Sequence, residues 1–257
     1  MSVLCGGSLQ SGPAGEQGVR QRRALVVDYR GILDAVRRHV ERQKVDCAVT
    51  SGNPASEKAV AATEAKLKVR LPAELREFYR TVADGYAMFW QVDPNDAKQA
   101  FGGLQVPKLS SLAEMYSGWR GMALYNPEQA EKYGFPYTKD PALAKRTASR
   151  QWHWLPVIKE GNGDLICLDL SVSGGPVIFH KHDWLDGGTG NDGHPLASSW
   201  RAFLAGWGSV CFQFPDGLYW PPCFKPGGGV AWDSEQFRSP FRVVSLAEPN
   251  AAADGGA

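Results

Sequence analysis

The stretch from Trp152 to Leu204 constrains the fold most, because it reads as three short apolar strands followed by an amphipathic helix. The first strand ends at Gly161-Asn162-Gly163-Asp164, where the glycines permit the positive φ that a tight hairpin needs. The second strand covers Leu165 to Leu170, the third covers Val177 to Phe179, and Ser198-Ser199-Trp200 begins the helix. This pattern is typical of the centre of a sheet and not of a catalytic site.

The N-terminal half of the sequence predicts helices followed by strands. Apolar residues three and four apart indicate helices over Ala24 to Val45, Ala55 to Lys68 and Leu71 to Val82, with Pro72 in the first turn of the third. Gly85 suits the position after a helix C-terminus, because glycine adopts a left-handed backbone without strain. Two strands are then expected, over Tyr86 to Trp90 and Phe101 to Val106, and a short helix over Leu109 to Tyr116.

The remaining segments are less regular. Residues 117 to 150 mix aromatic residues with prolines and basic residues, so we expect an irregular insertion there. Val210 to Phe214 alternates like a strand, whereas Tyr219 to Phe224 contains two prolines and cannot be a central strand. We expect a mobile arm over residues 1–22, a single domain over residues 23–245 and a flexible tail over residues 246–257.

Composition excludes several classes of protein. The 257 residues carry a formal net charge of +1, which gives no overall field for nucleic acid, and no apolar run is long enough to cross a membrane. The five cysteines are scattered without a CxxC pair, which argues against a zinc ribbon or a disulfide framework. We therefore expect a cytoplasmic protein that binds neither nucleic acid nor membrane; its oligomeric state is left open.

Four segments in this order resemble the SUKH superfamily, which groups a fungal cell-wall-assembly regulator with many bacterial toxin-immunity proteins. They are the Leu71-Pro72 helix LPAELREFYRTVADG, the strand Tyr86 to Val92, the hairpin Ile158 to Asp169, and Val177 to Asp183 followed by the helix Leu196 to Leu204. The resemblance covers about residues 55–207. The helix at 24–45, the insertion at 93–150 and the extension at 208–245 have no place in the minimal family pattern.

The resemblance implies an α+β fold with a central, mainly antiparallel sheet packed against helices. It also implies a binding protein without a cofactor: an immunity protein that neutralises a cognate toxin, such as a nuclease or another intracellular effector, by stoichiometric binding. The alternative that it leaves open is a non-catalytic regulatory scaffold of the cell-wall-regulator type.

Histidines near the third strand raise the question of a metal site. His180 and His182 are two residues apart, which on a strand places both rings on one face, and Asp164, Asp183 and His194 are further possible ligands. A zinc-dependent hydrolase would need such a set. Alternating polar residues more often mark the solvent face of a strand, and no nucleophile motif or phosphate loop is present, so we expect no metal, no cofactor and no catalysis.

The segment from Asp183 to His194, DWLDGGTGNDGH, is the sequence's best candidate for partner binding. It is acidic and glycine-rich, and a tryptophan stands near its start. Asp183, Asp186 and Asp192 would attract a basic partner during encounter, and Trp184 would anchor it. The alternative is a plain flexible loop whose tryptophan folds onto the core.

Overall fold

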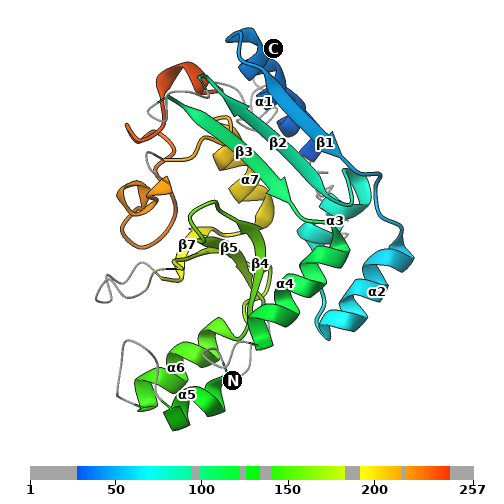
Figure 1. The fold of residues 1–257 in the computed structure, drawn as a ribbon, viewed down its shortest axis with the longest axis vertical. Coiled ribbons are helices and arrows are strands. Elements are labelled where there is room, and N and C mark those ends of the chain that lie inside the picture. The colour runs from blue at the N-terminus through cyan, green and yellow to red at the C-terminus, as the bar shows by residue number, and fades with distance from the viewer. Residues whose placement is uncertain are drawn as a thin grey trace, which may run out of the picture.

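The computed structural model describes residues 28–93, 99–121, 126–133, 141–182, 192–215 and 218–243. Within these ranges it confirms the α+β class, with seven α-helices and two antiparallel sheets packed together (Figure 1). The helices are α1 (Tyr29–Arg42), α2 (Glu57–Leu67), α3 (Ala73–Thr81), α4 (Leu109–Gly121), α5 (Pro127–Tyr133), α6 (Pro141–Gln151) and α7 (Trp200–Gly208). The strands are β1 (Cys47–Ser51), β2 (Tyr86–Gln91), β3 (Phe101–Val106), β4 (Trp154–Lys159), β5 (Leu165–Asp169), β6 (Val177–His180) and β7 (His194–Ala197).

The strands that we expected in one central sheet form two. β1, β2 and β3 make the first sheet in that order, and β4 to β7 make the second. All the pairings are antiparallel. Short connections join β4 to β5 and β5 to β6, whereas α2 and α3 lie between the paired strands β1 and β2. β3 and β4, each at an edge of its own sheet, lie next to each other, so the two sheets meet along these strands (Figure 1).

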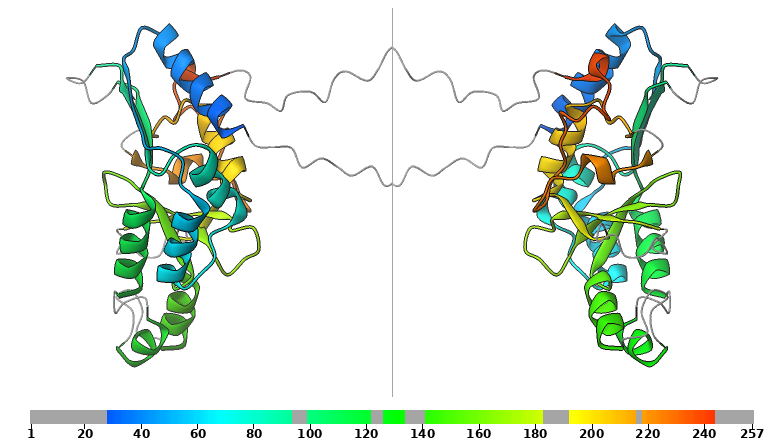
Figure 2. Two further views of the ribbon diagram at one scale, coloured as in Figure 1. Left: turned by 90° about the vertical axis from the view of Figure 1, so that its right-hand side faces the viewer. Right: turned by 90° about the vertical axis from the view of Figure 1, so that its left-hand side faces the viewer.

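The first sheet buries one face and leaves the other open. Tyr86, Met88 and Trp90 alternate inward along β2, whereas Phe89 points outward and is 50% exposed. Figure 2 shows α1 and α7 on one side of this sheet. One continuous cluster of buried apolar residues reaches from Tyr29 in α1 to Phe241 near the end of the described chain.

Local capping explains the helices that the sequence predicted correctly. The hydroxyl of Ser56 accepts a hydrogen bond from the N–H of Ala59 at the start of α2. Pro72 is the N-cap of α3, where its missing N–H costs nothing. α3 ends at Thr81 with Val82 as its C-cap, so Gly85, whose φ is +88°, lies beyond the helix end at which we expected it and instead makes the turn into β2.

The expectation of an irregular segment over residues 117–150 was wrong for the part that the structure describes, residues 117–121, 126–133 and 141–150. α4 continues to Gly121, and α5 and α6 are helical and pack against each other at the end of the molecule remote from the first sheet (Figures 1 and 2). Tertiary packing stabilises them: Trp119 and Ala148 are buried in a second apolar cluster with Cys167 of β5. Contacts this distant in sequence leave no local periodic signal, which is why the pattern failed.

Three strand assignments also needed correction. Residues 210–214 form a turn, because Cys211 and Phe212 have positive φ, and only an isolated bridge joins Gln213 to β3. β1 was missed because four of its five residues are exposed and show no alternation. β7 was taken for loop and helix, since Pro195 interrupts it; as an edge strand it tolerates the missing N–H. Among the described residues no helix is long and apolar enough to span a membrane.

Candidate partner-binding site

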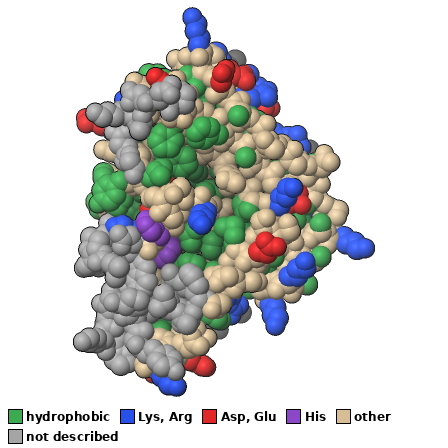
Figure 3. Space-filling model, in the orientation of Figure 1, with side chains coloured by type: hydrophobic (Ala, Val, Ile, Leu, Met, Phe, Trp, Pro, Cys, Tyr) green, Lys and Arg blue, Asp and Glu red, His purple; other side chains and the backbone are tan. Residues whose placement is uncertain are grey.

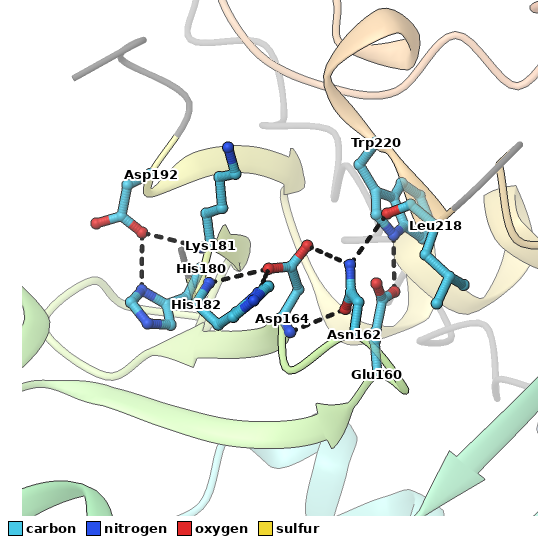
Figure 4. Close-up of polar contacts among 9 residues, drawn as sticks. All are labelled: Glu160, Asn162, Asp164, His180, Lys181, His182, Asp192, Leu218 and Trp220. Atoms are coloured by element: carbon cyan, nitrogen blue, oxygen red, sulfur yellow. Dashed lines mark hydrogen bonds and ion pairs between the residues drawn. The ribbon is translucent and has the colours of Figure 1, made fainter. Parts of the chain in front are cut away.

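The hairpin between β4 and β5 is held by its own side chains. Gly163 has a φ of +100°, and the Asn162 side chain accepts a hydrogen bond from the N–H of Asp164 at 3.0 Å. The same side chain donates to the Asp164 carboxylate at 2.9 Å and to the carbonyl of Leu218 at 3.3 Å (Figure 4). The turn therefore places the buried carboxylate of Asp164, which is 4% exposed, in a fixed position.

Asp164 holds the chain directly after β6. Its Oδ1 accepts hydrogen bonds from the backbone N–H of His182 at 2.9 Å and from the ring Nδ1 of His182 at 2.6 Å. The His182 side chain is 46% exposed, so the ring covers the carboxylate from the solvent side. Position 182 is thereby fixed to the hairpin of the second sheet.

Asp192 makes the corresponding contacts after the next segment. Its Oδ1 lies 2.8 Å from Nδ1 of His180 and accepts from the N–H of Lys181 at 3.3 Å, while its Oδ2 accepts from the Gln151 amide at 2.7 Å. The ring of His180 is buried, with the edge-on ring of Trp119 4.8 Å away. Position 192 is therefore tied to both β6 and α6.

These two acid–histidine pairs hold the chain on either side of residues 183–191. We call Asp164, His180, His182 and Asp192 the histidine–aspartate network (Figure 4). Of the four residues predicted to contact a partner, Asp183, Trp184 and Asp186 lie outside the described residues. Asp192 is described, and both of its carboxylate oxygens already have partners within the chain.

The histidines take separate partners instead of converging. β6 ends at His180, so His182 lies beyond the strand and the rule that alternate residues share a face does not apply. The idea that these histidines mark a solvent face was wrong for His180, which is 3% exposed. The ring of His194 stacks on Phe224 at 4.0 Å. Within the described ranges, no three histidine, cysteine or acidic side chains gather in a way that could hold a metal ion.

A buried carboxyl group that the sequence did not single out lies beside the network. Glu160, which directly follows β4, is 3% exposed, and its Oε1 accepts a hydrogen bond from Nε1 of Trp220 at 2.7 Å (Figure 4). Burial raises the pKa of Glu160 to about 8, with Asp164 adding to the rise and the Trp220 hydrogen bond opposing it. At neutral pH this carboxyl is mostly protonated. No local signal reveals the pair, because 60 residues separate its members.

The fold and the site define a class of protein: an α+β domain whose histidine–aspartate network holds the chain in position and shows no arrangement for catalysis among the described residues. The chain belongs to the SMI1/KNR4 family (SUKH-1), whose family model matches residues 54–206. This agrees with the resemblance seen over residues 55–207. The match runs from just before α2 into α7 and leaves α1, β1 and the segment after α7 outside it. A search of curated proteins gives no match.

Proposed function

We propose that this protein is an immunity protein that neutralises a cognate toxin, a nuclease or another intracellular effector, by direct stoichiometric binding. Two facts support the proposal. The SUKH family includes immunity proteins as well as cell-wall regulators, and its members are generally non-catalytic. The carrying observation is that the two acid–histidine pairs fix the chain immediately before and after the acidic segment 183–191.

The fold fixes positions 182 and 192, so in this proposal it sets where the two ends of the segment are presented to a partner. Holding the residues that flank a binding segment in place reduces the entropy that binding costs. Asp183 and Asp186 would speed the encounter with a basic partner, for example a basic nuclease, and Trp184 would supply the apolar contact. In this proposal Asp192 positions the segment, since its carboxylate is engaged within the chain.

Co-expression with the neighbouring toxin gene tests the proposal. We expect the wild-type chain to restore growth of the toxin-producing host and to elute with the toxin as a complex on gel filtration. The variant with Asp183→Lys, Trp184→Ala and Asp186→Lys is expected to lose both effects, while the matched control Lys58→Glu on the exposed face of α2 keeps them. Growth arrest with wild-type protein and no complex would overturn the proposal.

The same experiment separates the proposed function from that of a scaffold. A regulator of the cell-wall type would bind several host proteins and give no protection against the toxin. Affinity capture from the host without the toxin gene, compared with capture in its presence, distinguishes the two. We expect one dominant captured protein, and only when the toxin is expressed.

A further inference from the structure

A cleft of about 990 Å³ opens where the two sheets meet. Its walls come from the ends of β1, β3 and β4 and the starts of β2 and α4, and none of the histidine–aspartate network lines it. The volume is that of a site for a ligand or a short peptide. Figure 3 shows apolar side chains gathered on this part of the face, with a basic side chain among them. The apolar part of the lining includes Pro107, Met115 and Val157.

The charge of the cleft is positive. Lys108 and Lys159 both line it and are exposed, and within the described part of the chain neither ammonium group has a hydrogen-bond or ion-pair partner. The acidic residue in the lining is Glu160, whose buried carboxyl is mostly protonated at neutral pH because burial raises its pKa. The remaining polar lining consists of neutral groups such as Thr50 and Ser111. An anionic ligand therefore meets two cations and little repulsion.

The backbone of the cleft adds an edge of β3 that is not hydrogen-bonded to β4, the neighbouring strand of the second sheet. On the side of β3 that faces away from β2, the N–H of Gly103 donates to the carbonyl of Phe212, and the carbonyl of Phe101 accepts from the N–H of Phe214. Because backbone groups alternate along a strand, those of Gln105 point to the same side. Gln105 lines the cleft, and its N–H and carbonyl on that side have no backbone partner among the described residues. Such an edge pairs with extended peptides.

Two glycines shape the walls beside the lysines. A Cβ on Gly52 would overlap the carbonyl oxygen of Asp84, so the chain leaving β1 crosses the segment between α3 and β2 too closely for any side chain. A Cβ on Gly85 would lie 2.7 Å from Cγ of Lys108. The aliphatic part of Lys108 therefore rests on Gly85, which directs the side chain along the wall of the cleft.

We propose that this cleft binds an extended acidic segment of a partner protein, whose carboxylates pair with Lys108 and Lys159 and whose backbone pairs with the open edge of β3 at Gln105. The apolar lining takes the side chains that alternate with the acidic ones. This surface is distinct from the acidic segment 183–191. The cleft is basic and would bind an acidic partner, whereas the segment is acidic and would bind a basic one. It does not depend on toxin neutralisation, so either proposal can fail while the other stands.

Fluorescence anisotropy with a labelled seven-residue peptide that alternates Glu and Val tests the site on the purified full chain. We expect saturable binding, and a loss of at least tenfold in affinity for the double variant Lys108→Glu, Lys159→Glu. The control variant Lys58→Glu makes the same charge change at a position outside the cleft. A control peptide in which Lys replaces Glu carries charge of the wrong sign for the two lysines. The control protein is expected to bind like wild type, and the basic peptide is expected not to bind.

Backbone methylation tests the strand edge. Methylating the peptide nitrogens of the Glu residues in one peptide and of the Val residues in another blocks the two edges of the peptide separately, and we expect one of the two to abolish binding. Equal binding by both methylated peptides would overturn the pairing at Gln105. The proposed site would be overturned if the peptide does not bind, or if the double variant binds it with unchanged affinity. Full competition by inorganic phosphate at equal charge would also overturn it, because that result would indicate a simple anion site. Circular dichroism of each variant confirms that it is folded.

Discussion

The carboxylates beside the β4–β5 hairpin and the lysines of the cleft between the sheets differ in what already holds them. Asp164 and Asp192 each accept several hydrogen bonds within the chain, and most of these reach residues 11 to 41 positions away. Lys108 and Lys159 have no such partner in the described ranges. Charge in the first region therefore sets the geometry of the chain, whereas charge in the second is available to another molecule. We therefore expect substitutions in the network to lower the free energy of unfolding, and substitutions of the cleft lysines to weaken the binding of an acidic partner.

Glu160 gives the largest expected effect, because it is buried beside the network yet lacks a cationic partner. Its pKa rises from 4.5 to about 8 on folding, so between these pH values the unfolded chain has lost a proton that the folded chain keeps, and stability falls as the pH rises. At about 1.4 kcal/mol per unit, the whole shift corresponds to roughly 5 kcal/mol. Urea unfolding from pH 4 to 8.5 measures it.

The side chain of the variant Glu160→Gln stays neutral and keeps an oxygen that accepts from the indole of Trp220. Its stability should therefore not fall with rising pH through this group. We expect its unfolding free energy to match that of the wild type near pH 4 and to exceed it increasingly up to pH 8. A constant difference between the two proteins across this range would show that Glu160 does not titrate as described.

Asp164→Ala should cost about 3 kcal/mol of unfolding free energy, because it removes a buried hydrogen-bond acceptor. The backbone N–H of His182 and the side-chain amide of Asn162 would both lose the carboxylate to which they donate. Chemical denaturation at pH 7 is the measurement. Asp233→Ala, at an exposed position, is the matched control and should change stability by less than about 0.5 kcal/mol. Equal effects of the two substitutions would contradict the structural role of the hairpin carboxylate.

Asp192→Ala should cost about 2 kcal/mol of unfolding free energy, somewhat less than Asp164→Ala. The Asp192 side chain is 27% exposed, so water can replace part of the hydrogen bonding that it provides. It should also weaken toxin binding, because one end of segment 183–191 would no longer be fixed. Asp192→Asn keeps an oxygen that can accept from Gln151 or Lys181 and should lose less of both. Weaker binding by the Asn variant than by the Ala variant would argue against positioning by these hydrogen bonds.

Lys108→Ala and Lys159→Ala should be nearly silent in stability, within about 0.5 kcal/mol, since neither side chain has a partner to lose among the described residues. Thermal unfolding of the two single variants and of the double variant checks this. A marked loss of stability would mean that these lysines belong to the fold and would remove the contrast with the network.

The parts of the fold that the sequence predicted are those with local signals. The Pro72 helix, the glycine turn at 161–164 and the apolar strands after it follow from the conformations of single residues and from periodicity. The parts that it missed depend on distant contacts: α6 is held through Ala148 in the second apolar cluster, and Cys211 adopts positive φ in a turn that packs against Trp90.

The same distinction holds at the candidate site. Sequence reasoning named His180, His182, Asp164 and Asp192 but grouped the histidines as possible metal ligands, because strand spacing suggests which residues share a face and not which residues meet. The pairing of each histidine with a different carboxylate depends on how β5, β6 and α6 are placed in space. The Glu160–Trp220 pair links the family domain to the extension after α7, which no local pattern could show.

Titration of the toxin's activity with the purified chain tests the central claim most directly. If the protein neutralises the toxin by stoichiometric binding, the activity should fall linearly and reach zero at a molar ratio of one to one, and Glu160→Gln, which lies outside segment 183–191, should give the same end point. Full activity in the presence of excess protein, or inactivation by far less than one equivalent, would contradict the account.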